Sequence, residues 1–237
     1  MEQVSFPSAG AVVPALLWRP GSDAPAPGLV IVHGDDGLDD LARKAAAAIA
    51  AEGFAVVAPD LQARVAHLTD PQERRRSLAD LLAIDDLTAA QRFLQAQPGV
   101  IAQRVGALGF SLGGRHAYLL AAHRADLGLC VALSGRPEHA DTLGRQYLSP
   151  VDLAPRISCP VLGLYGGADA EIPLAEVERF RDTLSRARVP FEIKIYPGVG
   201  HRFYDPRVPE EFDAAAAQDA WERVTRFCFM FLMGRRP

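Results

Sequence analysis

Cysteine is scarce in this chain of 237 residues, which has only Cys130, Cys159 and Cys228. An odd number of widely separated cysteines predicts neither a disulfide framework nor a metal site built on closely spaced thiols. So few cysteines are typical of a protein from a reducing compartment. We therefore expect no disulfide and no metal centre.

An excess of positive charge is also missing. Lysine occurs only at positions 44 and 194, and the 25 basic residues are outnumbered by 29 acidic ones, which gives a net charge of −4. A protein that coats nucleic acid needs a basic surface, so we expect no nucleic-acid partner. The hydrophobic share of 49 % and the charged share of 23 % exclude a disordered chain and a coiled-coil rod.

Long apolar runs are absent as well. The richest, residues 227–233, is much shorter than the roughly 20 residues that a transmembrane helix needs. The N-terminus carries an early Glu2 and no basic stretch before an apolar one, which does not match a signal peptide. We therefore expect a cytoplasmic protein with no membrane partner.

The sequence does contain a regular alternation of short apolar runs and longer helical patterns. The apolar runs are typical of parallel strands that helices cover on both faces. Their alternation with helices predicts an α/β protein with a doubly wound, mostly parallel sheet, in one domain over residues 1–237 and without a large cap. We expect strands over residues 12–18, 29–32, 54–58, 105–110, 128–133, 161–165 and 191–196, and helices over 38–52, 73–96, 112–123, 174–188 and 210–233.

The strongest motif is Gly109-Phe110-Ser111-Leu112-Gly113, which lies between a predicted strand and a predicted helix. It matches the G-x-S-x-G pattern of a nucleophile elbow. A strand that turns directly into a helix forces its middle residue into a strained backbone conformation, and small residues two positions away let the turn close. We predict that Ser111 is a nucleophile. The alternative is a glycine-rich turn in which Ser111 only caps the helix.

A serine nucleophile needs a base, and the base needs an acid that orients it. Asp169 follows the predicted strand over 161–165 after two glycines, and we predict that it is the acid, with Glu171 as a competitor. His201 lies in a glycine-rich loop after the predicted strand over 191–196. Of the six histidines only His201 fits the chain order Ser, Asp, His, so we predict that it is the base.

Two backbone amides are predicted to form an oxyanion hole. One belongs to Leu112, the residue after the nucleophile. The other is expected from the loop with the sequence HGDDG at residues 33–37, where the amide of Asp35 has the best position. The adjacent acids Asp35 and Asp36 either face solvent or favour neutral or cationic acyl groups.

Together these motifs resemble the dienelactone hydrolase family within the α/β-hydrolase superfamily. The resemblance implies an α/β-hydrolase fold and hydrolysis of a carboxylic ester or lactone. It departs from the founding members at two places, because Ser111 stands where they have a cysteine and Gly34 where they have a glutamate. The segments that carry it are Ala58-Pro59-Asp60-Leu61, Asp70-Pro71-Gln72-Glu73-Arg74, Gly109 to Gly114, Gly166-Gly167-Ala168-Asp169 with Pro173, and Gly200-His201-Arg202-Phe203.

The resemblance also implies arginines that bind a substrate carboxylate. In this chain a solvated or structural role is the competing interpretation for each, and no arginine is singled out. The candidates are Arg64, Arg74, Arg115, Arg136, Arg202 and Arg207.

We therefore expect a serine hydrolase of a small carboxylic ester or lactone, acting through Ser111, His201 and Asp169 and an acyl-enzyme intermediate. It should need no metal and no organic cofactor, and should act as a monomer or a homodimer on a small molecule. One alternative is a non-catalytic protein of the same fold that binds a ligand or a partner. Another is a peptidase or thioesterase that uses the same three residues.

Overall fold

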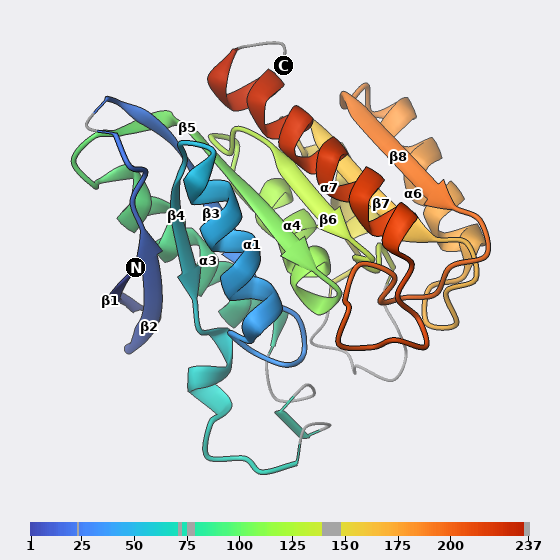
Figure 1. Ribbon diagram of the computed structural model, residues 1–237, viewed down its shortest axis with the longest axis horizontal. Helices are drawn as coiled ribbons and strands as arrows, with labels where there is room; N and C mark the ends of the chain where they lie inside the picture. Colours follow the sequence, from blue (N-terminus) through green and yellow to red (C-terminus); the bar gives the residue numbers. More distant parts are fainter. Residues whose placement is uncertain (23, 71–72, 75–78, 139–147, 235–237) are drawn as a thin grey trace.

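A single eight-stranded sheet forms the centre of the computed structural model, which describes residues 1–22, 24–70, 73–74, 79–138 and 148–234 (Figure 1). The strand order is β1-β2-β4-β3-β5-β6-β7-β8. Only the β1–β2 and β2–β4 pairs are antiparallel. The predicted doubly wound, mostly parallel sheet is confirmed. The strands are β1 (Glu2–Ser8), β2 (Ala11–Trp18), β3 (Ala26–Val32), β4 (Ala55–Pro59), β5 (Val100–Phe110), β6 (Cys130–Leu133), β7 (Val161–Gly166) and β8 (Phe191–Tyr196).

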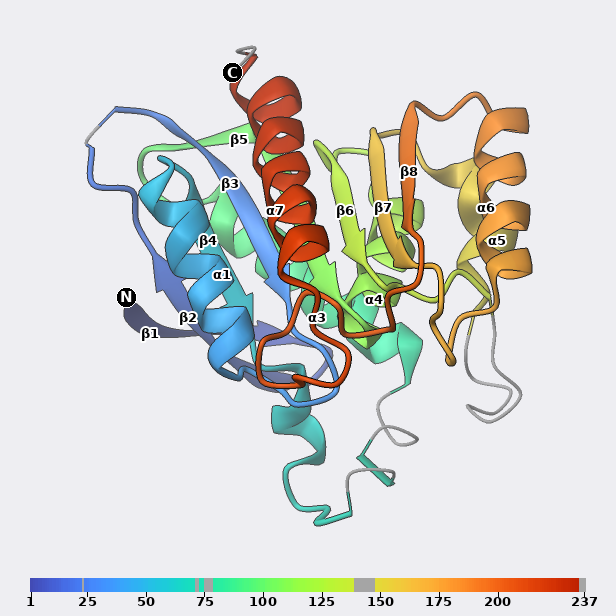
Figure 2. The ribbon, with the colours of Figure 1, turned by 45° about the vertical axis from the view of Figure 1, so that its right-hand side comes forward.

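Helices cover both faces of the sheet. Figure 2 shows α1 and α7 together in front of the strands, and α3 and α4 behind them. Each face has its own cluster of buried apolar residues, one with α1 and α7 and one with α3, α4 and α6. The helices are α1 (Asp40–Ala51), α3 (Asp80–Gln95), α4 (Leu112–His123), α5 (Pro150–Leu153), α6 (Leu174–Arg186) and α7 (Ala214–Cys228), with short 3₁₀ turns η1 (Leu61–Val65) and η3 (Ala154–Arg156) and a π-helical turn η4 (Phe229–Met233).

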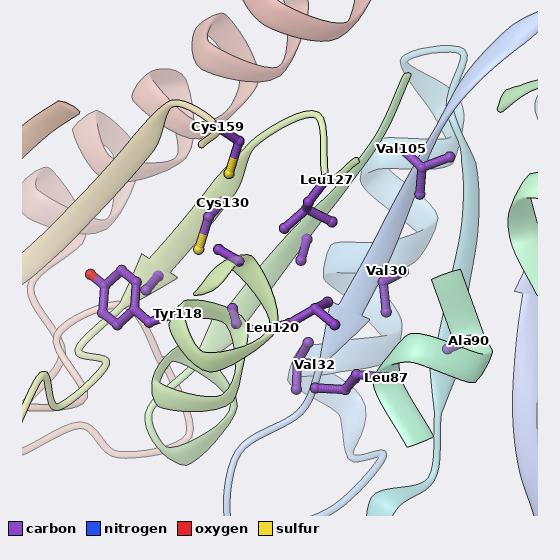
Figure 3. Packing of buried hydrophobic residues seen from close by; sticks show 14 of the residues in the cluster. Val30, Val32, Leu87, Ala90, Val105, Tyr118, Leu120, Leu127, Cys130 and Cys159 are labelled. Atoms are coloured by element: carbon purple, nitrogen blue, oxygen red, sulfur yellow. The ribbon is translucent and has the colours of Figure 1, made fainter. Parts of the chain in front are cut away.

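Every residue of β3 is buried, which explains why its sequence is apolar without alternation. Val30 and Val32 pack in the cluster that contains α3 and α4, and Leu29 and Ile31 pack in the cluster that contains α1 and α7. Figure 3 shows Val30 and Val32 beside Leu87 of α3. Apolar residues on both faces of one strand therefore hold the two helix layers on the sheet.

Two predictions about the N-terminal half need correction. Strand β1 was not predicted, because its mostly polar residues form an edge strand that is largely exposed. The single helix predicted over residues 73–96 is also wrong, because Ala79 is extended and α3 begins only at Asp80. Residues 71–72 and 75–78 of the predicted segment lie outside the described residues.

In the C-terminal half, the last helix and the segment before β7 also differ from the prediction. The last helix begins at Ala214 rather than at residue 210, because the side chain of Asp213 accepts a hydrogen bond from the amide of Ala216 and caps the helix there. The segment over residues 134–160, expected to be a loop, contains α5 and η3, and its residues 139–147 lie outside the described part. No helix of the described residues is long and apolar enough to cross a membrane.

The carboxyl ends of the parallel strands meet at one edge of the sheet, at the bottom in Figure 1. The segments that follow β3, β5, β7 and β8 at this edge are residues 33–37, 111–114, 167–172 and 197–201. Ligands of open α/β sheets bind at this edge. The fold thus brings all the predicted site residues to the same side of the molecule.

Candidate active site

Ser111 lies in the sharp turn between β5 and α4, with the strained backbone angles φ 50° and ψ −118°. The turn closes around glycine, because a Cβ on Gly109 would lie 2.1 Å from the carbonyl oxygen of Gly113. The Ser111 side chain makes no capping hydrogen bond to α4. Ser111 thus occupies the N-cap position without capping α4 through its side chain, and the hydroxyl is available for other partners.

The structure brings Ser111, His201 and Asp169 together in a chain of hydrogen bonds. The Ser111 Oγ lies 2.9 Å from Nε2 of His201, and Nδ1 of His201 lies 2.7 Å from Oδ2 of Asp169. The imidazole and the carboxylate are almost completely buried. A carboxylate accepts only, so Nδ1 carries the proton and Nε2 is left to accept the proton of the serine hydroxyl.

Asp169 is fixed by the backbone that follows it. Its Oδ1 accepts hydrogen bonds from the amides of Glu171 at 2.7 Å and Ile172 at 3.0 Å, which leaves Oδ2 directed at the histidine. The competing acid, Glu171, lines the cavity in front of Ser111, and the carboxylate that accepts the hydrogen bond from His201 is that of Asp169. The geometry thus favours Asp169 for the orienting role.

His201 has a raised pKa. Burial alone lowers its pKa, but the hydrogen bond and charge of Asp169, together with the charges of Glu171 and Glu211, outweigh burial and raise the pKa above the usual 6.5. A raised pKa makes the imidazole a stronger base toward the serine proton.

Two polar residues that the sequence did not point to hold the backbone around His201. The buried hydroxyl of Ser134 donates a hydrogen bond to the carbonyl of His201 at 2.7 Å, and Oε2 of Glu211 accepts one from the amide of Arg202 at 2.7 Å. Ser134 could have been found from the sequence, because it directly follows the strand β6 and so lies at the same sheet edge as Ser111. Nothing in the sequence marked Glu211.

The loop after β3 is positioned by His33, a buried residue whose side chain bridges two backbone segments. Its Nε2 accepts a hydrogen bond from the amide of Leu61 at 3.0 Å, so its Nδ1 carries the proton and donates to the carbonyl of Gly34 at 2.7 Å. Burial lowers the pKa of His33, which favours this neutral form. The C=O of Gly34 and the N–H of Asp35 belong to the same trans peptide and therefore point in opposite directions. Because this C=O faces His33, the amide N–H of Asp35 points away from His33.

The sequence predicted a role only for the backbone amide of Asp35, but its side chain also lies close to Ser111. The hydroxyl of Ser111 is 3.2 Å from Oδ2 of Asp35 and 2.9 Å from Nε2 of His201. One hydroxyl proton therefore has two acceptors. The other predicted amide donor, Leu112, is the first residue of α4, where backbone N–H groups have no acceptor within the helix.

The serine opens onto a cavity of about 230 Å³. Phe110, Tyr204 and Leu41 are among the apolar residues that line it, and several carboxylates line it as well. Phe203, which follows the histidine loop, is instead fully buried between the rings of Tyr196 and Tyr204. Phe110 and Tyr204 are thus the aromatic residues in position to contact a substrate.

Three of the six candidate arginines are bound to carboxylates that do not line the cavity, and Arg207 pairs with Asp39, which does. Arg64 pairs with Asp86, Arg115 with Asp80, and Arg136 with Glu176, while Arg74 donates to a backbone carbonyl. Among the described residues only Arg202 lines the cavity.

The three cysteines do not provide an alternative nucleophile. All are buried, and burial raises the pKa of Cys159 and of Cys228 to about 12 and that of Cys130 well above the usual range. A protonated, enclosed thiol is unreactive. Among the described residues, no cluster of three or more His, Cys, Asp or Glu side chains could hold a metal ion.

Comparison with protein-family models matches residues 13–231 to the dienelactone hydrolase family. The chain belongs to the dienelactone hydrolase family. The resemblance drawn from the sequence motifs is therefore confirmed, and the match covers all the segments that carried it. Members of the dienelactone hydrolase family are carboxylic ester hydrolases, and this chain is an enzyme of that class.

Individual relatives agree with this assignment. The carboxymethylenebutenolidase of Rhodococcus opacus is 34 % identical over 202 residues, which cover 83 % of this chain and 78 % of that protein. A crystal structure from Klebsiella pneumoniae, described as a "Putative Dienelactone Hydrolase", has a TM-score of 0.86 at 31 % identity and covers 99 % of this chain and 98 % of its own. A dienelactone hydrolase-like promiscuous phosphotriesterase from metagenomic libraries has a TM-score of 0.76 at 26 % identity, covering 97 % and 96 %. The α/β-hydrolase fold is thereby confirmed.

Proposed function

We propose that this dienelactone hydrolase family member cleaves small carboxylic esters or lactones by a serine mechanism, with Ser111 as nucleophile, His201 as base and Asp169 as orienting acid. The observation that carries the proposal is the continuous chain of hydrogen bonds from the Ser111 hydroxyl through the imidazole to the carboxylate. A strained serine at a helix N-terminus, a buried imidazole and a fixed carboxylate are the parts that nucleophilic acyl transfer requires.

In the first half-reaction the oxygen of Ser111 attacks the carbonyl carbon while Nε2 of His201 takes the hydroxyl proton. Asp169 holds the imidazole in the required tautomer and stabilises the imidazolium that forms. The amides of Leu112 and Asp35 are proposed to donate hydrogen bonds to the oxyanion. The imidazolium then protonates the leaving alkoxide, which leaves an ester on Ser111.

In the second half-reaction water attacks this acyl-enzyme. His201 removes a proton from the water and later returns it to Ser111, so that the carboxylic acid leaves and the enzyme is restored. With a lactone, the alkoxide and the acid belong to the same product molecule. No step of this sequence calls for a metal or an organic cofactor.

A small ester or lactone is supported as substrate by the cavity and by the relatives. About 230 Å³ is sufficient for a small molecule, and Phe110 and Tyr204 offer an apolar surface beside the nucleophile. The name of the Rhodococcus opacus relative, carboxymethylenebutenolidase, denotes hydrolysis of a lactone by that protein. Here the serine in place of a cysteine favours a mechanism in which the histidine takes the proton in every cycle.

A fluorophosphonate probe tests the proposal, because it forms a stable adduct only with an activated serine. Mass spectrometry is expected to locate the adduct on Ser111. The Ser111→Ala variant should lose labelling and lose at least roughly 10⁴-fold in kcat/KM for a neutral aryl acetate.

The matched control is Ser158→Ala, which removes an exposed hydroxyl in the connection before β7. This variant should label and turn over like the parent protein. Unchanged turnover in a folded Ser111→Ala protein, or an adduct on another residue, would overturn the mechanism. A folded parent protein that the probe does not label would likewise overturn the assignment of Ser111 as the nucleophile.

A further inference from the structure

A second hollow adjoins the cavity in front of Ser111. It is a groove of about 250 Å³, and three of its lining residues, Leu41, Phe110 and Tyr204, also line the catalytic cavity. Phe110 directly precedes Ser111 in the chain, so the groove begins beside the nucleophile. The groove and the catalytic cavity therefore meet at these three side chains.

The base of the groove comes from the carboxyl ends of two neighbouring strands. Phe110 at the end of β5 and Leu133 at the end of β6 are paired in the register of the sheet, and both line the groove. Both side chains are buried in the apolar cluster on the face that α1 and α7 cover. The groove thus extends from the sheet edge that presents Ser111 onto this helix-covered face.

The sides of the groove come from α1 and α7, which both cover that face of the sheet (Figure 2). Ala45 and Ala48 of α1 and Ala217 of α7 line it, together with Trp221 one turn further along α7. Small side chains on both helices leave the space between them open, and the indole of Trp221 supplies a large aromatic surface. We call this hollow the α1–α7 groove.

The α1–α7 groove differs in chemistry from the catalytic cavity. Four Asp or Glu side chains line the cavity, whereas among the described residues the groove is lined by no acid and by one charged side chain, that of Lys44. Apolar surface that faces water is unfavourable, and apolar grooves on a soluble protein often receive a ligand. An apolar group therefore fits this groove better than a polar or anionic group.

The size of the catalytic cavity also favours a second subsite. Its volume of about 230 Å³ lies below the roughly 300–1,000 Å³ of ordinary ligand pockets, so it holds a small ester and little more. The α1–α7 groove adds a volume of about 250 Å³ at the border of this cavity. A substrate whose carbonyl carbon lies at Ser111 can thus place an apolar tail in the groove.

We propose that the α1–α7 groove is a subsite for an apolar tail of the ester substrate, a short alkyl chain or a ring. Ala48 and Ala217 are the specificity-determining residues that leave room for this tail. The inference rests on the proposed serine mechanism at Ser111. It narrows the substrate class to esters that carry an apolar group on the acyl or the alcohol side.

Two series of esters test for the tail, and each kcat/KM is divided by the rate of alkaline hydrolysis of that ester. The 4-nitrophenyl esters of acetate, butanoate and hexanoate lengthen the acyl side, and ethyl, butyl and hexyl acetate lengthen the alcohol side. Full burial of one methylene strengthens binding roughly fourfold, so partial burial in a groove should give about twofold per methylene and at least roughly tenfold over a whole series. The series that responds identifies which side of the ester enters the groove. A flat profile in both series would overturn the subsite.

Bulky side chains in the groove test its location. Ala48→Phe and Ala217→Phe each fill part of the groove, so the ratio of kcat/KM for the longest ester of the responding series to that for the shortest should fall at least roughly fivefold. The matched controls, Ala47→Phe and Ala215→Phe, add the same side chain at exposed positions of α1 and α7 that do not line the groove. These controls should keep the ratio of the parent protein.

The ratio also guards against a trivial loss of activity. Both esters are measured on the same preparation, so a smaller fraction of folded enzyme lowers both values and cancels from the ratio. Ratios in both filled variants that equal those of their controls would show that the tail binds elsewhere, and would overturn the assignment of the groove.

The outcomes separate this inference from the proposed function. Ser111-dependent hydrolysis of the acetate, with no gain for longer esters, would overturn the subsite and leave the serine mechanism in place. Equal hydrolysis of the acetate by folded Ser111→Ala and by the parent protein would overturn the serine mechanism, and the inference with it.

Discussion

At the scale of single residues, the chemistry depends on which nitrogen of His201 holds a proton. The imidazole can accept the proton of Ser111 only while it is neutral. Burial alone favours that neutral form, whereas Asp169 and the carboxylates of Glu171 and Glu211 favour the charged form and raise the pKa. The acids that orient and surround His201 therefore raise the pH above which its imidazole is neutral and can accept the serine proton.

The sign of this effect gives a prediction for the pH profile. As pH falls through the raised pKa of His201, the base becomes protonated, so kcat/KM should fall with an acid limb whose midpoint lies above 6.5. Glu171→Gln removes a negative charge that raises this pKa, so the limb should move to lower pH. The measurement is kcat/KM for a neutral ester between pH 5 and 9.

Asp182→Asn serves as the matched control, because it removes one exposed charge that lies outside the cavity wall. Its acid limb should coincide with that of the parent protein. A limb that stays in place or moves to higher pH in Glu171→Gln would show that Glu171 does not act on the base.

At the scale of elements, the segment between β8 and α7 places His201 without regular secondary structure of its own. Asp205 holds this segment together from a fully buried position. It accepts hydrogen bonds from the Arg202 side chain and from the amide and side chain of Arg207. Burial raises the pKa of Asp205, but the hydrogen bonds from Arg207 and Arg202 outweigh burial and lower the pKa to about 2.

Removal of this carboxylate should therefore affect both stability and catalysis. We expect Asp205→Ala to lower the free energy of unfolding by about 2–3 kcal/mol, because two guanidiniums lose their shared buried acceptor. A looser histidine loop should also lower kcat more than it changes KM. Denaturant unfolding and steady-state kinetics of the same preparation measure the two effects.

Glu178→Ala is the comparison for this prediction. Glu178 lies on α6, is exposed, and pairs with Arg181 three residues later. An exposed pair of this kind contributes less than about 1 kcal/mol, so the variant should unfold near the parent midpoint and keep its kcat. Equal losses in the two variants would contradict the special role of the buried Asp205.

The elements that the sequence predicted well have clear local boundaries. Helix α4 begins and ends where it was predicted, at Leu112 and His123, because the glycine-rich elbow marks its start. Strand β8 also matches over Phe191–Tyr196, because prolines flank it on both sides. The order of Ser111, Asp169 and His201 along the chain was likewise sufficient to select the residues that the fold brings together.

Features that depend on distant pairs could not be predicted in this way. The break before α3 is one, since nothing local shows that Asp80 will be buried against Arg115, 35 positions later. The acidic wall of the cavity is another, because Asp36 and Arg202 are 166 residues apart in the chain. The local sequence pattern around a charged residue does not indicate which distant charged residue it will pair with in the fold.

At the scale of the whole molecule, a buried ionic cluster joins the elements behind the nucleophile elbow. Oδ2 of Asp80, the first residue of α3, accepts hydrogen bonds from Arg115 of α4 at 2.8 Å and from the amide of Leu148 at 2.7 Å. Its Oδ1 lies 3.3 Å from Nε2 of His116. Arg115 also donates to the carbonyls of Glu138 and Leu148. One carboxylate thereby connects α3, the elbow helix and the segment before α5.

This cluster predicts how the stability of the whole protein depends on pH. Burial raises the pKa of Asp80, but the hydrogen bond from His116 and the charge of Arg115 outweigh burial and lower the pKa below its usual 3.8. At acid pH the unfolded chain then takes up protons that the folded chain does not, so the free energy of unfolding should fall as pH decreases below about 4. Asp205, whose pKa is lowered to about 2, acts in the same direction.

Asp80→Asn should change this dependence in two ways. At pH 7 it should lower the free energy of unfolding by about 3 kcal/mol, because Arg115 keeps its buried charge and loses the opposite one. Between pH 5 and pH 3 its stability should decline less than that of the parent protein, because one of the carboxylates that drive the decline is gone. Urea unfolding at a series of pH values measures both effects, and Asp182→Asn should follow the parent curve throughout. Parallel curves for Asp80→Asn and the parent protein would show that Asp80 titrates alike in the folded and unfolded chains, and that the acid sensitivity arises elsewhere.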